Sequence, residues 1–145
     1  MKTKLSWPLF WALLGVFVVV VCLFFIEPLN DLFGGSGLFL APFAVCFLLA
    51  VALLVFTLRE KIAGLLKAFF LLTAASAAGV FVFILLHNLV YGLFIHFFGE
   101  GFLNGGDEPF FFILATIVCP LGFLTGAVGS IVLSIVLRIR NARSR

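Results

Sequence analysis

Four long runs of apolar residues, separated by short polar segments, dominate the pattern of the chain. The runs cover residues 8–26, 38–58, 68–98 and 110–137. They contain no Asp, Glu, Lys or Arg, and none alternates polar with apolar residues as membrane β-strands do. A helix needs roughly 20 apolar residues to cross a hydrocarbon core of about 30 Å. The pattern therefore predicts an all-α integral membrane protein, a bundle of four transmembrane helices. We place these helices at residues 8–26, 38–58, 65–98 and 109–137 of a single membrane domain, 1–145, which ends in a short basic tail, 138–145.

Composition agrees with this pattern. Apolar residues make up 65% of the chain and charged residues 10%, against roughly 45–50% and 25% in soluble domains. Lys2 and Lys4 give the first run a basic start, but the run is longer than the core of a cleaved signal peptide. We therefore expect the first run to be retained as a helix.

The charged residues predict an orientation. With four helices, the N-terminus, the turn at residues 59–67 and the C-terminus share one side of the membrane, and these three segments hold all nine basic residues. Five of the six acidic residues lie in the two opposite loops. Because Lys and Arg stay on the cytoplasmic side in short loops, both termini are expected to be cytoplasmic. We expect a multi-pass protein in the cytoplasmic membrane of a prokaryote.

Small residues predict how two of the helices pack. Gly122, Gly126 and Ser130 recur every four residues in the fourth run, and a small-residue stretch that ends at Gly79 lies in the third. Small residues let helix backbones approach closely in lipid. The seam is expected to join these two helices, or alternatively to bind a second copy or a partner. Gly126→Leu is expected to separate the two helices, and Gly126→Ala to be milder, because alanine still belongs to the small class. Pro120 predicts a kink in the fourth helix.

The polar residues of the third run form the candidate site. His87, Asn88 and Tyr91 share one helix face, and His96 lies about half a revolution from His87 at ~100° per residue. His87 follows Lys67 by 20 residues, about 30 Å along a helix, which places the cluster at the outer boundary. Three interpretations stay open: anchoring at the interface, a polar binding site, or a metal site shared with carboxylates of the outer loop. Anchoring is the interpretation we favour.

Other chemistry has little support in the sequence. The three cysteines lie in different runs and form no Cys-x-x-Cys pair, and no phosphate loop, catalytic triad or zinc-protease motif occurs. We therefore predict no enzymatic activity, no cofactor and no bound metal. No feature indicates nucleic acid as a partner. Beyond the bilayer itself, a second membrane protein or another copy of the chain is the expected partner.

Two functions remain. The first is a non-enzymatic accessory or scaffold subunit of a membrane complex, favoured by the lack of ionisable residues inside the spans. The second is a small transporter or channel that uses the cluster of His87, Asn88 and Tyr91. A separate hypothesis concerns the C-terminus, where basic side chains are expected to set topology or to contact lipid headgroups. These side chains are Arg138, Arg140, Arg143 and Arg145.

Overall fold

The computed structural model describes residues 5–26, 40–62, 64–99 and 109–144, and these are helical almost throughout, without a strand. Four stretches are long and apolar enough to cross a membrane, which confirms the predicted all-helical architecture with four candidate spans. The elements are α1 (Ser6–Phe25), α3 (Leu40–Arg59), α4 (Gly64–Phe98), α5 (Pro109–Ile113), the π-helical turn η2 (Leu114–Val118) and α6 (Cys119–Arg143).

The fourth span differs from its predicted form at the C-terminal end. We expected a helix to residue 137 followed by a basic tail, but α6 continues to Arg143. The residues concerned are good helix formers, and neither Gly nor Pro interrupts them. Most of the predicted tail is therefore the last part of a helix.

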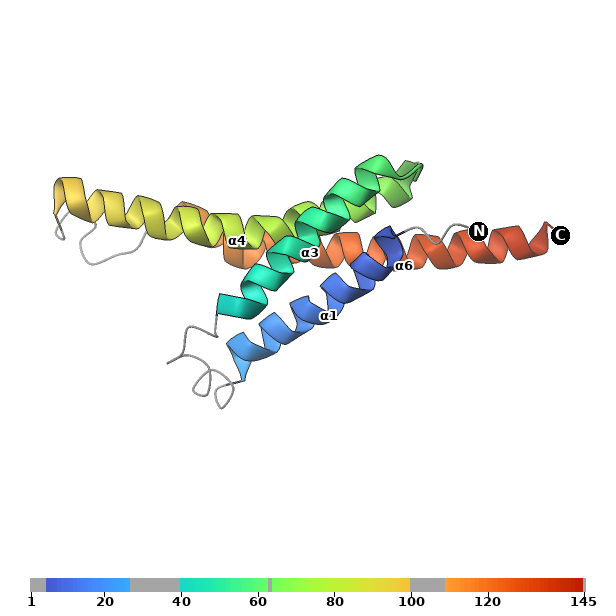
Figure 1. The fold of residues 1–145 in the computed structure, drawn as a ribbon, viewed down its shortest axis with the longest axis horizontal. Coiled ribbons are helices and arrows are strands. Elements are labelled where there is room, and N and C mark those ends of the chain that lie inside the picture. The colour runs from blue at the N-terminus through green and yellow to red at the C-terminus, as the bar shows by residue number, and fades with distance from the viewer. Residues whose placement is uncertain (1–4, 27–39, 63, 100–108, 145) are drawn as a thin grey trace.

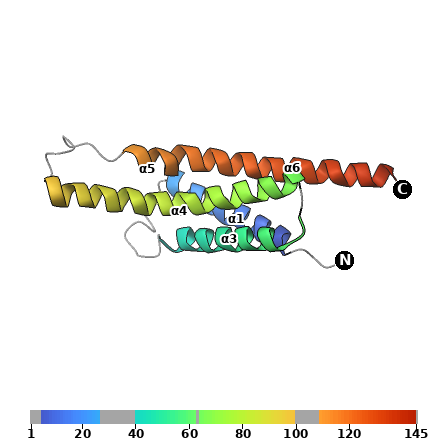
Figure 2. The same ribbon diagram turned by 90° about the horizontal axis from the view of Figure 1, so that it is seen from above.

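The helices form two antiparallel pairs that cross (Figures 1 and 2). One pair consists of α4 and the continuous stretch α5–η2–α6, and the other of α1 and α3. α4 contacts both α3 and α6 and is therefore the central helix of the fold. The start of α1, the end of α3, the start of α4 and the end of α6 lie at one end of the molecule (Figure 2). We call this end the basic end, because it carries every basic residue that the structure describes.

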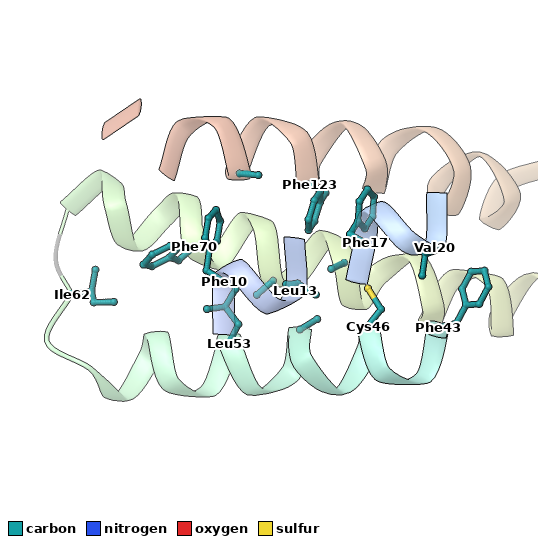
Figure 3. Packing of buried hydrophobic residues seen from close by; sticks show 14 residues of the cluster. Phe10, Leu13, Phe17, Val20, Phe43, Cys46, Leu53, Ile62, Phe70 and Phe123 are labelled. Carbon is teal, nitrogen blue, oxygen red and sulfur yellow. The ribbon is translucent and has the colours of Figure 1, made fainter. Parts of the chain in front are cut away.

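Aromatic side chains join the two pairs in the core (Figure 3). Phe17 of α1 stacks on Phe123 of α6 with a centroid distance of 3.8 Å and an interplanar angle of 16°. Phe10 lies 5.3 Å from Phe70 of α4, and Trp7 lies 5.1 Å from the same ring. Buried aromatic pairs of this kind contribute about 0.5–1.5 kcal/mol each beyond the area they bury. These contacts hold α1 against the other pair.

The chain irregularity at Pro120 takes the form of a π turn. The N–H of Cys119 donates to the carbonyl of Leu114, five residues earlier, so the helix widens over η2 directly before the proline. Pro120 has no N–H, and a wider turn accommodates a residue that cannot continue the ordinary ladder. The irregularity that the structure describes here is thus a π turn over Leu114–Val118, which includes Thr116 and ends two residues before Pro120.

The two pairs differ in length. α1 and α3 have 20 residues each, about 30 Å at 1.5 Å per residue, which matches a hydrocarbon core. α4 has 35 residues, about 52 Å, and the α5–η2–α6 stretch also has 35. Ile84 is the last residue of α4 that packs against the core cluster. Beyond it, residues 85–98 of α4 and α5 extend past the α1–α3 pair (Figures 1 and 2), and we call them the projecting pair.

Candidate functional site

The seam between α4 and α6 has almost no spare room at the predicted packing residues. A Cβ atom on Gly126 would lie 2.7 Å from the backbone N of Thr73 and 2.9 Å from the carbonyl O of Phe69. At Gly122 the nearest atom to such a Cβ would be the hydroxyl of Ser76. The two backbones therefore approach most closely at Gly126, where main-chain atoms leave no space for a methyl group.

Two further predicted packing residues lie along the same seam. A Cβ on Gly79 of α4 would lie 2.8 Å from the sulfur of Cys119. Ser130 is fully buried, and its hydroxyl has no hydrogen-bond partner among the described residues. Gly129 lies under the ring of Phe69, whose atoms would come within 2.5–2.8 Å of an added Cβ.

The predicted polar cluster lies on the projecting pair. His87 packs its ring against Phe112 of α5, with a centroid distance of 5.6 Å. Asn88 is exposed, and its amide donates to the carbonyl of Ile84 in its own helix at 2.8 Å. Tyr91 is half-buried. No sequence pattern indicates the contact between His87 and Phe112, because the two residues are 25 positions apart in different helices.

His96 does not join this cluster. α4 runs without a break through Gly92, so His87 and His96 project from opposite sides of one helix at ~100° per residue. The ring of His96 packs on its neighbour Phe97, with a centroid distance of 5.1 Å. The carboxylates that the metal hypothesis requires, among them Glu100 and Asp107, lie outside the described residues. Among the described residues no group of three or more potential metal ligands comes together.

The basic end contains a polar contact that the sequence analysis missed. Glu60, in the turn after α3, accepts a hydrogen bond from the backbone N–H of Ser6 through Oε1 at 3.2 Å. No side chain of α1 caps this helix, so a carboxylate from another part of the fold supplies the acceptor. A negative charge is favourable at a helix N-terminus, where unpaired N–H groups carry partial positive charge. The available signal was that Glu60 is the one acid outside the two acidic loops.

The C-terminal arginines are exposed on the last two turns of α6. Arg138, Arg140 and Arg143 belong to the C-terminal part of α6, and Arg145 lies outside the described residues. The end of α6 extends past the α3–α4 turn (Figure 2). Arg59 and Lys61 are exposed at the same end of the molecule.

A small cavity lies between α1, α3 and α4. Its volume is about 10 Å³, and its walls include Phe17, Phe43, Cys46 and Phe81. A cavity of this size holds at most about one water molecule, and an apolar lining of this kind keeps cavities dry.

Comparison of the chain with protein-family models, with curated proteins and with solved structures finds no match.

Proposed function

We propose that this protein is a non-enzymatic accessory or scaffold subunit that binds another membrane protein through the projecting pair. The basic end faces the cytoplasm in this proposal, and the projecting pair lies on the outer side. The observation that carries the proposal is a set of exposed apolar side chains beyond the polar cluster of α4. The largest are Leu93, Phe97, Phe98 and Phe110.

The polar cluster supports a membrane boundary at its own height. His87 and Asn88 would be costly in the middle of a hydrocarbon core, and Tyr is enriched at membrane interfaces. The length of α1 and α3 agrees, since both match the hydrocarbon core, and Ile84 is the last residue of α4 that packs against the core cluster. A boundary there leaves the last two turns of α4 above the bilayer.

Apolar side chains above the bilayer would be exposed to water unless another protein surface buries them. Phe97 is 71% exposed and Phe98 is 61% exposed, and both lie in the last turn of α4. Exposed apolar patches of this kind mark interaction sites, because contact with water is unfavourable. The partner that fits is an integral membrane protein with an apolar surface that rises above the outer bilayer face. Tilt of the long pair is the competing explanation, because it would return these residues to lipid.

The test has two arms. In the first, the purified protein is reconstituted in liposomes without its native cysteines, and Leu93→Cys and Leu124→Cys variants are exposed to a water-soluble thiol reagent. Leu124 on α6 is 53% exposed, against 44% for Leu93, but it lies at the height of the core beside Phe123. We expect reaction at position 93 and none at position 124. Absence of reaction at both positions would support tilt and contradict the proposal.

The second arm uses a photocrosslinking amino acid at Phe97, with Leu124 as the control position, in native membranes. We expect one membrane protein of defined mass to crosslink at position 97 only, and to co-purify with the unmodified chain in fixed ratio. A product of twice the chain mass would indicate a homo-oligomer. Crosslinks to lipid alone, together with solute movement by the pure protein in liposomes, would replace this function with the transporter alternative.

A further inference from the structure

The charges at the basic end are not neutralised within the described part of the chain. Glu60 is the only acidic residue that the structure describes. Its Oε1 accepts the N–H of Ser6, and its Oε2 is buried without a partner among the described residues. The carboxylate thus binds the start of α1, and no described acidic residue pairs with the guanidinium groups of α6.

The lipid-facing surface of α6 continues into the same region. Val128, Val132, Ile135 and Ile139 recur at intervals of four, three and four residues, and each is 50–58% exposed. This spacing keeps them on one helix face. The apolar stripe therefore does not end where the charges begin, since Ile139 lies between Arg138 and Arg140.

The arginines border this stripe. At ~100° per residue, Arg138 lies about 100° to one side of Ile139 and Arg140 about 100° to the other. Arg143 follows Ile139 by four residues and lies about 40° from it, one turn nearer the end of the helix. Because α6 stays helical to Arg143, the three guanidinium groups keep these positions around one apolar side chain.

We propose that the last turns of α6 form a binding site for the phosphate groups of anionic lipids. The planar guanidinium group matches phosphate with paired hydrogen bonds, and the apolar stem of arginine can lie along acyl chains while its head reaches the headgroups. Ile139 then lies at the boundary between acyl chains and headgroups. Free phosphate offers the same charge, but it leaves the stripe uncovered, and the apolar residues therefore favour a lipid. This inference does not depend on the proposed partner at the other end of the molecule.

The test measures lipid binding to the purified full chain in a neutral detergent by native mass spectrometry. Phosphatidylglycerol and phosphatidylcholine of equal chain length are the probes. The test variant carries Arg138→Gln, Arg140→Gln and Arg143→Gln together. We expect its apparent affinity for phosphatidylglycerol to fall about a hundredfold, from roughly fivefold for each charge removed. Binding of phosphatidylcholine should not change.

The matched control removes the same charge from the same end of the molecule. It carries Arg59→Gln, Lys61→Gln and Lys67→Gln. We expect its fold loss of affinity for phosphatidylglycerol to be less than roughly a tenth of the fold loss in the test variant. Equal losses in the two variants would show a general effect of charge and overturn the site. Thermal unfolding in the same detergent verifies that both variants are folded.

Two further measurements separate the site from its alternatives. Ile139→Gln keeps every charge, and we expect it to weaken binding of long-chain phosphatidylglycerol more than binding of a water-soluble short-chain analogue. Inorganic phosphate at millimolar concentration should not displace the bound lipid. Displacement by phosphate, with no effect of Ile139→Gln, would identify a site for free anions and overturn the assignment to lipid.

Discussion

Gly126→Ala offers the sharpest test of the fold, because main-chain atoms of α4 lie opposite this glycine. The added Cβ would lie 2.7 Å from the backbone N of Thr73 and 2.9 Å from the backbone O of Phe69. Real Cβ atoms do not approach other heavy atoms within 3.0 Å. Because these are backbone atoms of α4, relief requires the two helices to separate rather than one side chain to rotate.

The magnitude follows from comparison with a glycine that has open space around it. No atom lies within 4 Å of the Cβ position of Gly15 in α1. Gly15→Ala should stabilise the protein by about 0.5–1 kcal/mol, since alanine restricts the unfolded chain and favours the helix. Gly126→Ala has the same intrinsic gain but loses about 1–3 kcal/mol through overpacking. The difference between the two variants in free energy of unfolding should therefore be about 1–3 kcal/mol.

The assay is unfolding by sodium dodecyl sulfate in mixed micelles, followed by circular dichroism. Gly122→Ala should lie between the two variants, because the nearest atom there belongs to the flexible hydroxyl of Ser76. An unfolding free energy for Gly126→Ala equal to that of Gly15→Ala would refute the described contact between α4 and α6.

Three other predictions concern the two ends of the molecule. Glu60→Ala should lower the free energy of unfolding by about 1 kcal/mol and speed hydrogen exchange at the first turn of α1. Glu60→Gln keeps an acceptor oxygen and should lower the free energy of unfolding by less. Unchanged hydrogen exchange after Glu60→Ala would contradict the cap. His87→Phe should leave thermal stability in detergent unchanged, because a phenyl ring keeps the contact with Phe112, and a folded variant that fails to complement a deletion strain would give His87 a functional role. In cells, an external thiol reagent should label Ser36→Cys but not Ser144→Cys once the native cysteines are replaced, and labelling at position 144 would reverse the proposed orientation.

The apolar pattern was sufficient to predict the number of spans and most of their limits. Uncharged runs of this length have no other stable form in lipid, where each backbone polar group needs a partner in the chain. The end of α6 was missed because charge, rather than a helix breaker, was used to end the helix at Leu137. Arginine is a good helix former, so a change from apolar to basic residues marks a membrane boundary and not the end of a helix.

The site residues were predictable only as far as they depend on one helix. Periodicity correctly separated His87 from His96, because both lie on the unbroken α4. It could not indicate that Phe112 covers His87, or that Glu60 lies beside Ser6, since these contacts join residues whose separation is set by helix crossing. The same limit applies at Gly126: residue size predicts a close approach of two helices, but only the helix crossing determines which backbone atoms lie opposite the glycine.

The difference in length between the two helix pairs connects the proposals at the two ends. α4 extends beyond one end of the α1–α3 pair and α6 beyond the other (Figure 2). In the proposed placement α1 and α3 span the hydrocarbon core, and these two extensions leave it on opposite sides. The extensions differ in chemistry: the end of α4 is rich in aromatic residues and contains no Asp, Glu, Lys or Arg, whereas the end of α6 contains three arginines with Ile139 and Ala142 between them. Lipid headgroups can pair with the charges at the end of α6. They cannot bury the apolar side chains at the end of α4, because headgroups are polar. We therefore propose different complements for the two extensions, a protein partner at the end of α4 and anionic lipid at the end of α6.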